Sequence, residues 1–190
     1  MTDDEILAEF QTAEALLQGH FVLSSGLHSA RYLQCARVLA SPPRAERLAR
    51  ALASKLSGIA VDVVVSPAMG GVVIGHEMGR ALGVDALFLE RPGGTFELRR
   101  GFRLERDQRV LLVEDVVTTG LSSREAIAAV AREGARVVAA CALVDRSDGK
   151  ADLGVPFTPL VRLSVPSYSA DALPPELAAL PAIKPGSRAS

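Results

Sequence analysis

The chain lacks the sequence features of a membrane protein, a secreted protein or a common nucleotide-binding protein. It has no apolar run long enough to cross a bilayer, and it opens on Asp3, Asp4 and Glu5 where a signal peptide would be basic and then apolar. Neither G-x-x-x-x-G-K-[ST] nor G-x-G-x-x-G occurs. The net charge of −1 lacks the excess of positive charge that is typical of proteins that bind nucleic acids. We therefore expect a cytoplasmic protein with no membrane partner and no nucleic-acid partner.

Cysteine and lysine are scarce. Cys35 and Cys141 lie far apart in apolar surroundings, which favours two buried thiols in a reducing compartment. No pair of Cys or His residues has the spacing of metal ligands. The lysines are Lys55, Lys150 and Lys184 alone, so arginine supplies nearly all of the positive charge.

Apolar strands and amphipathic helices alternate along the chain. The periodicity predicts helices over 3–18 and 44–56, a hairpin around Ser25-Gly26, strands over 61–65, 86–89, 110–113 and 136–144, edge strands within 154–165 and a loose tail end. A further helix carries Gly71, Gly75, Gly79 and Gly83 at steps of four, which predicts close packing on a neighbour. This alternation is typical of a single α/β domain over 1–190, with a parallel sheet flanked by helices.

The segment 110–123, Val-Leu-Leu-Val-Glu-Asp-Val-Val-Thr-Thr-Gly-Leu-Ser-Ser, carries most of the chemical information. An apolar strand ends in Glu114 and Asp115, and a hydroxyl-rich loop with Gly120 leads into a helix. Ligands of open α/β sheets bind at this edge, and the N–H groups of a helix start favour a phosphate. The two carboxylates suit ribose hydroxyls or a magnesium ion shared with the ligand. The segment therefore favours a sugar-phosphate site.

A purely structural interpretation of the same segment is also open. Ser122 and Glu125 fit a capping box at the start of a helix that follows an acidic turn. That interpretation accounts for these two residues. It does not account for two carboxylates at the point where a buried strand emerges.

The segment resembles the phosphoribosyl pyrophosphate (PRPP) signature of the type I phosphoribosyltransferases. Other segments narrow the resemblance to the orotate phosphoribosyltransferase family and extend it over almost the whole chain: 19–29, 90–91, 98–102, 144–146 and 184–188. The resemblance implies a type I phosphoribosyltransferase-like parallel sheet flanked by helices. It also implies a small hood subdomain, built from about 1–40 plus the carboxyl-terminal segment, over a core of about 41–165.

The resemblance further implies a reaction and its site. Ribose 5-phosphate would pass from PRPP to orotate, forming orotidine 5′-monophosphate and pyrophosphate in UMP synthesis, with Mg²⁺ held mainly through PRPP and no dedicated protein ligands. The residues implied to bind PRPP are Arg91, Glu114, Asp115, Val116, Val117, Thr118, Thr119, Gly120, Leu121 and Ser122. Those of the pyrophosphate loop are Ala68, Met69, Gly70 and Gly71, and those that contact orotate are Thr118, Arg146, Tyr32 and Leu33.

Residues 91–109 are rich in arginine and glycine. Taken alone, they are typical of a solvated hairpin, 95–98 with 99–104, whose arginines face water. The resemblance implies instead a mobile loop that completes the neighbouring subunit's site in a homodimer, with Arg99, Arg100 and Asp115 as catalytic residues. The better-known family pattern has lysines in this loop, in the pyrophosphate loop and in the hood, so Arg99 or Arg100 would have to supply the loop's cation.

Several alternatives stay open at this point. Arg146 would also fit a surface arginine paired with Asp145 or Asp148, and His20 and His28 fit structural hydrogen bonding as well as ligand contact. A purine-type phosphoribosyltransferase would also use the PRPP signature. A regulator could keep the fold and bind a purine or RNA without catalysis. The hood segment counts against the purine-type enzyme, and the near-neutral charge and the arginine-rich loop count against the regulator.

Overall fold

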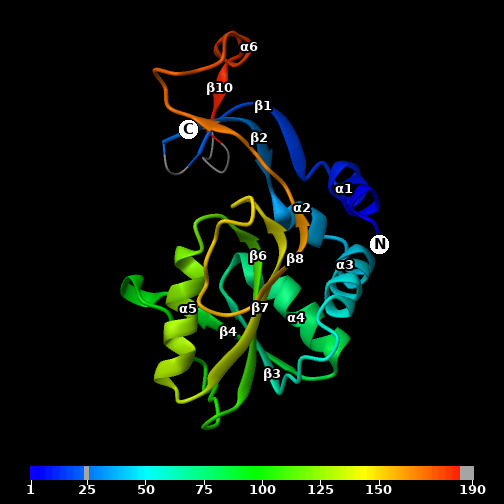
Figure 1. Cartoon of the computed structure of the whole chain (residues 1–190), viewed down its shortest axis with the longest axis vertical. Helices are drawn as coiled ribbons and strands as arrows, with labels where there is room; N and C mark the ends of the chain where they lie inside the picture. The colour runs from blue at the N-terminus through cyan, green and yellow to red at the C-terminus, as the bar shows by residue number, and fades with distance from the viewer. Residues whose placement is uncertain (24–25, 185–190) are drawn as a thin grey trace.

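The computed structural model describes residues 1–23 and 26–184 (Figure 1). Ser24 and Ser25, which belong to the expected hairpin turn, lie outside the described residues. So do residues 185–190, which hold the rest of the motif that begins at Lys184 and the tail end expected to be loose. Across the described ranges, no helix combines the length and the apolarity that a bilayer crossing requires.

A six-stranded sheet forms the centre of the core, in the order β5-β4-β3-β6-β7-β8. Its strands are β3 (Val63–Pro67), β4 (Asp85–Glu90), β5 (Glu97–Leu98), β6 (Arg109–Val117), β7 (Arg136–Asp145) and β8 (Phe157–Arg162). All neighbouring pairs are parallel except β4 with β5. Both faces are covered, which explains the nearly continuous apolar runs of β6 and β7. The predicted parallel sheet is confirmed, as is the edge position of the proline-containing β8.

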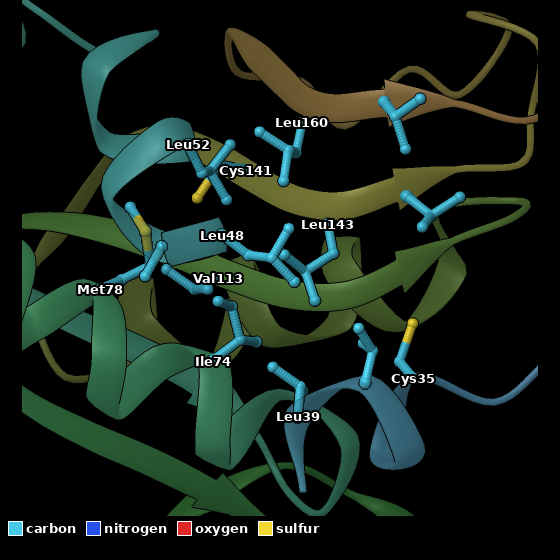
Figure 2. Packing of buried hydrophobic residues seen from close by; sticks show 14 of the residues in the cluster. Cys35, Leu39, Leu48, Leu52, Ile74, Met78, Val113, Cys141, Leu143 and Leu160 are labelled. Carbon is cyan, nitrogen blue, oxygen red and sulfur yellow. The ribbon is translucent and has the colours of Figure 1, made fainter. Parts of the chain in front are cut away.

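Helices cover the two faces of this sheet (Figure 1). On one face lie α3 (Pro42–Ser54) and α4 (Gly70–Leu82), and on the other lies α5 (Leu121–Arg132). Alternate residues of β6 point to opposite faces, so Leu111 and Val113 join one buried cluster while Val110 and Leu112 join the other. Figure 2 shows the first cluster, in which side chains of α3 and α4 meet those of the central strands.

The glycines of α4 let this helix approach the sheet closely. A Cβ at Gly75 would lie 2.5 Å from Ser66 Oγ, and a Cβ at Gly79 would lie 2.8 Å from the Ala86 Cβ. No L side chain larger than hydrogen fits there without a shift of the neighbour. The close packing predicted from the glycine spacing is therefore confirmed, and it brings the start of α4 to the carboxyl edge of the sheet.

A second sheet, in the order β10-β1-β2-β9, stands beyond that carboxyl edge. Its strands are β1 (Leu16–Val22), β2 (His28–Leu33), β9 (Ser167–Tyr168) and β10 (Ala182–Ile183), and we call them, with α6 (Pro175–Ala178), the hood. The short α2 (Cys35–Leu39) connects β2 to the core. The hood thus combines the first strands of the chain with its last described ones.

The predicted helix over 3–18 is wrong in its second half. α1 (Asp3–Thr12) begins with the predicted capping box, in which Thr2 and Glu5 exchange hydrogen bonds, but it ends before Glu14, whose φ of 49° is left-handed. Leu16 then pairs with Leu33 in the antiparallel β1–β2 hairpin. Apolar residues at 16 and 17 fit either period over so short a run, and the cross-strand pairing decides between them.

The hairpin considered for residues 91–109 is also wrong. A single 3-10 turn, η1 (Pro92–Gly94), leads into β5, and Leu98 of β5 pairs with Leu89 of β4. Arg100 and Gly101 follow in left-handed conformations and turn the chain away. The strand partner thus comes from the main sheet, and residues 99–104 form no second hairpin strand.

Candidate functional site

The signature segment 110–123 forms a cavity of about 270 Å³ at the carboxyl end of β6. We call it the loop cavity, because consecutive residues of one loop make most of its wall. It is lined by Arg91, Glu114, Val116, Val117, Thr118, Thr119, Gly120, Leu121, Ser122, Ser123 and Glu125. Every residue implied to bind PRPP is in this set except Asp115.

The start of α5 leaves backbone donors available at this cavity. Gly120 is the residue before the helix, with a φ of 74°, and no side chain caps the helix. The predicted Ser122–Glu125 capping box is wrong, because the Glu125 carboxylate accepts from Arg91 Nη2 at 2.5 Å instead. Uncapped N–H groups together with the positive end of the helix dipole suit a phosphate.

Glu114 and Asp115 end β6 in a buried setting. Glu114 is 7% exposed and accepts a hydrogen bond from Ser123 Oγ at 3.4 Å. Burial, and secondarily the charge of Asp115, raises the pKa of Glu114 to about 7. Burial also raises the pKa of Asp115. Two adjacent carboxylates therefore occupy a place that disfavours their charged forms, as is common at ligand sites.

The expected pyrophosphate loop lies beside Asp115. A Cβ on Gly70 would lie 2.7 Å from both carboxylate oxygens of Asp115, so only glycine lets the first turn of α4 pass this close. Met69 is 84% exposed, and the Ala68–Met69 peptide bond is cis. The structure thus brings together two segments that stand more than forty residues apart in the sequence.

The arginines of residues 91–109 separate into two groups. Arg91 lines the loop cavity, where its guanidinium stacks on the Phe96 ring at 3.9 Å from the ring centroid. Arg100 Nε donates to Glu90 at 2.7 Å, and Arg99 lies 3.7 Å from the same carboxylate. Neither Arg99 nor Arg100 lines the loop cavity, so this chain does not bring them to its own carboxylate pair.

A second cavity of about 500 Å³ lies between the core and the hood, and we call it the hood cavity. Its walls are Val22, Leu23, Leu27, Tyr32, Thr118, Thr119, Arg146, Val165, Ser167 and Lys184. Thr118 and Thr119 line both cavities. Of the residues implied to contact orotate, Leu33 alone lies outside this set, because its side chain is buried in the apolar cluster under α1.

Arg146 projects from the carboxyl edge next to the signature loop. β7 pairs with β6 so that Asp145 faces Val117, and the Arg146 N–H donates to the Val117 carbonyl at 2.8 Å. Its Nε is buried and has no hydrogen-bond partner within the described residues. Burial lowers the pKa of the guanidinium. A buried, partly unsatisfied guanidinium is suited to a carboxylate ligand.

The alternative of a surface-paired Arg146 is wrong. Asp145 accepts hydrogen bonds from Ser147 and Gly149 and lies 3.5 Å from Arg162 Nε. Asp148 lies 3.8 Å from Lys150 Nζ. Both of the acidic partners considered for Arg146 are therefore engaged elsewhere.

Some site residues were not recognised from the sequence. Cys35 lies behind the carboxylate pair, where its Sγ is 4.0 Å from the Asp115 carbonyl, and burial raises the pKa of this thiol well above its usual value. Glu125 holds Arg91, and Lys184 lines the hood cavity. No spacing signal connects these residues to the signature. The two histidines contact one another, at 2.6 Å between His20 Nε2 and His28 Nδ1, and neither lines the two cavities.

Comparison with known proteins places this geometry in a family. Residues 35–157 match the family described as the phosphoribosyl transferase domain. An orotate phosphoribosyltransferase of Rhizorhabdus wittichii is 70% identical over 100% of this chain and 98% of that protein. One of Caulobacter vibrioides is 57% identical over 99% of this chain and 98% of that protein.

Solved structures agree with these relatives. An orotate phosphoribosyltransferase from Aeropyrum pernix is 25% identical and superposes with a TM-score of 0.66 over 83% of this chain and 93% of that chain. One from Mycobacterium tuberculosis, in complex with inorganic phosphate, is 22% identical with a TM-score of 0.68 over 85% of this chain and 97% of that chain. The resemblance and the fold class predicted from the sequence are therefore confirmed.

Proposed function

The chain belongs to the phosphoribosyl transferase family, and on that premise we propose that it is an orotate phosphoribosyltransferase. It transfers the ribose 5-phosphate group of PRPP to orotate and forms orotidine 5′-monophosphate and pyrophosphate. A bond forms between N1 of orotate, which gives up its proton to solvent, and C1 of the ribose, while the bond from C1 to the pyrophosphate oxygen breaks and pyrophosphate leaves with that electron pair. The full-length similarity to relatives of that name supports this assignment.

One structural observation carries the proposal: the two cavities meet at Thr118 and Thr119. The loop cavity offers the donors of α5 for a phosphate, and the hood cavity offers the guanidinium of Arg146 for a carboxylate. A sugar phosphate in the first and a carboxylated pyrimidine in the second would meet beside the shared threonines. Holding two reactants in this way supplies much of the rate enhancement of a bimolecular transfer.

The remaining assignments follow from the contacts. Val116 to Ser122 would hold the 5-phosphate, and Arg91 with the loop Ala68–Gly71 would face the pyrophosphate. Glu114 and Asp115 would accept from the ribose hydroxyls and stabilise the positive charge that develops on the ring as pyrophosphate leaves. Thr118, Arg146 and Tyr32 would contact orotate, with Leu33 supporting them from the apolar cluster.

The donor set also fits Mg²⁺ carried by the substrate. The described ranges contain no cluster of three or more candidate metal-binding side chains, whereas a PRPP-bound ion needs few protein ligands. Mg²⁺ bound through the PRPP oxygens, beside Glu114 and Asp115, would neutralise charge on the departing pyrophosphate.

The direct test measures turnover of PRPP with three bases under identical conditions. We expect product with orotate and none with hypoxanthine or guanine. Turnover of a purine in place of orotate would assign the chain to the purine-type enzymes. A folded protein that turns over none of the three would instead be a PRPP-fold regulator.

We also propose that the protein is a homodimer in the cytoplasm, in which Arg99 and Arg100 act in the partner's site. In this chain both arginines are held on Glu90, outside the two cavities, and among the described residues Arg91 is the one cation that lines the loop cavity. A second subunit's loop would supply the missing positive charge for the pyrophosphate. The two free, buried cysteines are consistent with a reducing compartment.

Mixing two inactive proteins tests the shared loop. One carries Arg99→Ala with Arg100→Ala, and the other carries Glu114→Gln with Asp115→Asn. Mixed dimers would contain one site with both defects and one with neither, so activity should return. In the control mixture, Arg146→Ala replaces the loop variant and both defects lie in the core, so activity at orotate concentrations below the KM should not rise above that of the separate variants. Subunit exchange without recovery in the first mixture would mean that the loop serves its own chain.

A further inference from the structure

Arg124 lies at the end of the first turn of α5, where its guanidinium contacts two backbone carbonyls. Nη1 donates to the Thr119 carbonyl at 3.1 Å and to the Asp152 carbonyl at 2.8 Å. The first carbonyl belongs to the loop proposed to hold the 5-phosphate, and the second belongs to the segment that follows β7. One side-chain nitrogen thus connects the main chains of two segments that stand more than thirty residues apart in the sequence.

The segment after β7, residues 147–154, is held in place by hydrogen bonds, and we call it the brace. The Asp145 carboxylate accepts from the Ser147 N–H at 2.7 Å and from the Gly149 N–H at 3.1 Å. Ser147 Oγ accepts in turn from the Ala151 N–H at 2.9 Å. Asp145 is 0% exposed, so water competes little for its hydrogen bonds. The brace is therefore a firm support for the groups that are attached to it.

Gly120 lies tightly against the brace. A Cβ at Gly120 would lie 2.5 Å from Leu153 Cδ2 and 3.0 Å from Arg124 Nη1, and the Leu153 side chain is buried. Arg124 lines neither cavity, whereas Thr119 and Gly120 both line the loop cavity. The Arg124 contacts and the brace therefore stand on the side of the loop that faces away from this cavity.

The peptide unit between Thr119 and Gly120 can take two orientations that act oppositely on an anion. The unit is trans, so its C=O and N–H groups point in opposite directions. With the carbonyl held on Arg124, the Gly120 N–H lies on the cavity side and can donate to a phosphate. Glycine populates both signs of φ, so the unit could rotate at little cost if nothing held it. A rotated unit would direct the carbonyl oxygen at the phosphate and replace a donor by an acceptor that repels it.

We propose that Arg124 is a positioning residue for the 5-phosphate of PRPP, because it fixes the Thr119 carbonyl on the brace and so keeps the Gly120 N–H directed at the phosphate. This inference rests on the proposed function. The 5-phosphate keeps all of its bonds during the transfer, so its contacts are similar in the bound substrate and in the transition state. Loss of the Arg124 contacts should therefore raise the KM for PRPP and leave kcat nearly unchanged.

The test compares Arg124→Met with Arg124→Lys. For Arg124→Met we expect the KM for PRPP to rise about threefold to tenfold, and the affinity for ribose 5-phosphate, measured by calorimetry, to fall by the same factor. The kcat and the KM for orotate should change less than about twofold. Arg124→Lys should recover most of the loss, because one nitrogen makes both bonds and an ammonium group has three donors.

Arg47→Met is the matched control. Arg47 Nη1 also donates to a backbone carbonyl, that of Pro43 in the first turn of α3, at 3.2 Å, and Arg47 lines neither cavity. The variant therefore removes a similar contact at the start of another helix. It should keep the wild-type KM for PRPP and the wild-type affinity for ribose 5-phosphate.

Three results would overturn the inference. An unchanged affinity for ribose 5-phosphate in folded Arg124→Met would mean that the guanidinium does not orient the loop. Equal losses for PRPP and orotate with a lowered melting temperature, not recovered by lysine, would assign Arg124 a purely structural role. A loss of affinity at low salt that disappears at high salt would mean that Arg124 acts through its charge, which salt screens, and not through the carbonyl. Binding of ribose 5-phosphate requires no base, so this test stays separate from the orotate assay that decides the proposed function.

Discussion

The loop cavity and the hood cavity meet at two threonines but are built in different ways. The first is made mainly by consecutive residues, Val116–Ser123, on one strand-loop-helix unit. The second needs the hood hairpin, Arg146 after β7, the chain around Val165 and the carboxyl-terminal Lys184. A cavity of consecutive residues keeps its shape while that one unit is folded. A cavity of distant segments also requires the two sheets to stay in place.

The chemistry of the two cavities differs accordingly. Backbone N–H groups at a helix start bind any phosphate of suitable size, so under the proposed function the loop cavity would provide affinity with little discrimination. Charged side chains in a partly buried cavity reject ligands that leave them unpaired, so the hood cavity would provide the selectivity. Variants in the first should therefore act on PRPP, and variants in the second on orotate.

The largest effect is expected at the carboxylate pair, which would lie beside the ribose carbon where the bond to pyrophosphate breaks. Glu114→Gln with Asp115→Asn should lower kcat/KM by about 10²–10³, because charge stabilisation of the transition state is lost. The free energy of unfolding should not fall. Burial raises the pKa of both carboxyls because it disfavours their charged forms, and the neutral Gln and Asn side chains have no charge to bury. Steady-state kinetics and thermal melts measure the two quantities. A folded double variant with near wild-type activity would remove these residues from the ribose site.

Arg146→Ala should have the next largest effect, and it should change the kinetics of one substrate much more than those of the other. We expect the KM for orotate to rise about tenfold to a hundredfold, because a charge-assisted contact is worth roughly 1.5–3 kcal/mol. The KM for PRPP should change less than about threefold. Arg162→Ala is the matched control, since Arg162 lies at the same edge but pairs with Asp145 and lines neither cavity. Equal changes for both substrates would assign Arg146 a structural role.

Gly120→Ala should produce the opposite pattern. Gly120 has a φ of 74°, and a Cβ there would lie 2.5 Å from Leu153 Cδ2, so the loop must shift. An alanine in this left-handed backbone conformation is strained by about 1–2 kcal/mol. We therefore expect the KM for PRPP to rise by up to about tenfold, with a smaller change in the KM for orotate. Gly134→Ala shares the positive φ at 85° but meets only the Arg106 Cα at 4.0 Å. This control should lose stability alone, and an equal effect on the KM for PRPP would contradict the prediction.

How the two cavities are built also explains how much of the site could be predicted. The loop cavity follows from the sequence because strand, acids, hydroxyls and helix are consecutive. Arg146 could be found because it directly follows a buried strand, and the carboxyl ends of parallel strands share one edge. Segment 184–188 carries part of the resemblance, but the place of Lys184 at the hood cavity could not be predicted, because it depends on the pairing of β10 with β1 at the other end of the chain.

The same contrast holds for the fold. The alternation of strands and helices predicted the core sheet, and the glycines of α4 predicted its close packing. The end of α1 was missed because Leu16 and Leu17 satisfy a helical period, whereas their partners in β2 are distant in sequence. The contact of Glu125 with Arg91 was missed for a related reason, since a capping box is local and this ion pair is not.

The smallest expected effect is on the free energy of unfolding. It tests whether the charge of the buried Glu114 carboxylate at the loop cavity destabilises the folded protein. The folded-state pKa of Glu114, about 7, is raised above the ordinary value of 4.5, so the folded state binds the proton more tightly than the unfolded state. Its contribution is fully present below about pH 4.5 and is lost as the pH rises through 7. Linkage then predicts a fall of about 1 kcal/mol between pH 6 and pH 7, or about 2–4 °C in melting temperature. The measurement is the difference in melting temperature between wild type and Glu114→Gln across this pH range, in ligand-free, Mg²⁺-free buffer, in which contributions common to the two proteins cancel. Parallel curves for the two proteins would show that Glu114 is already ionised in the folded protein and that its burial carries no such cost.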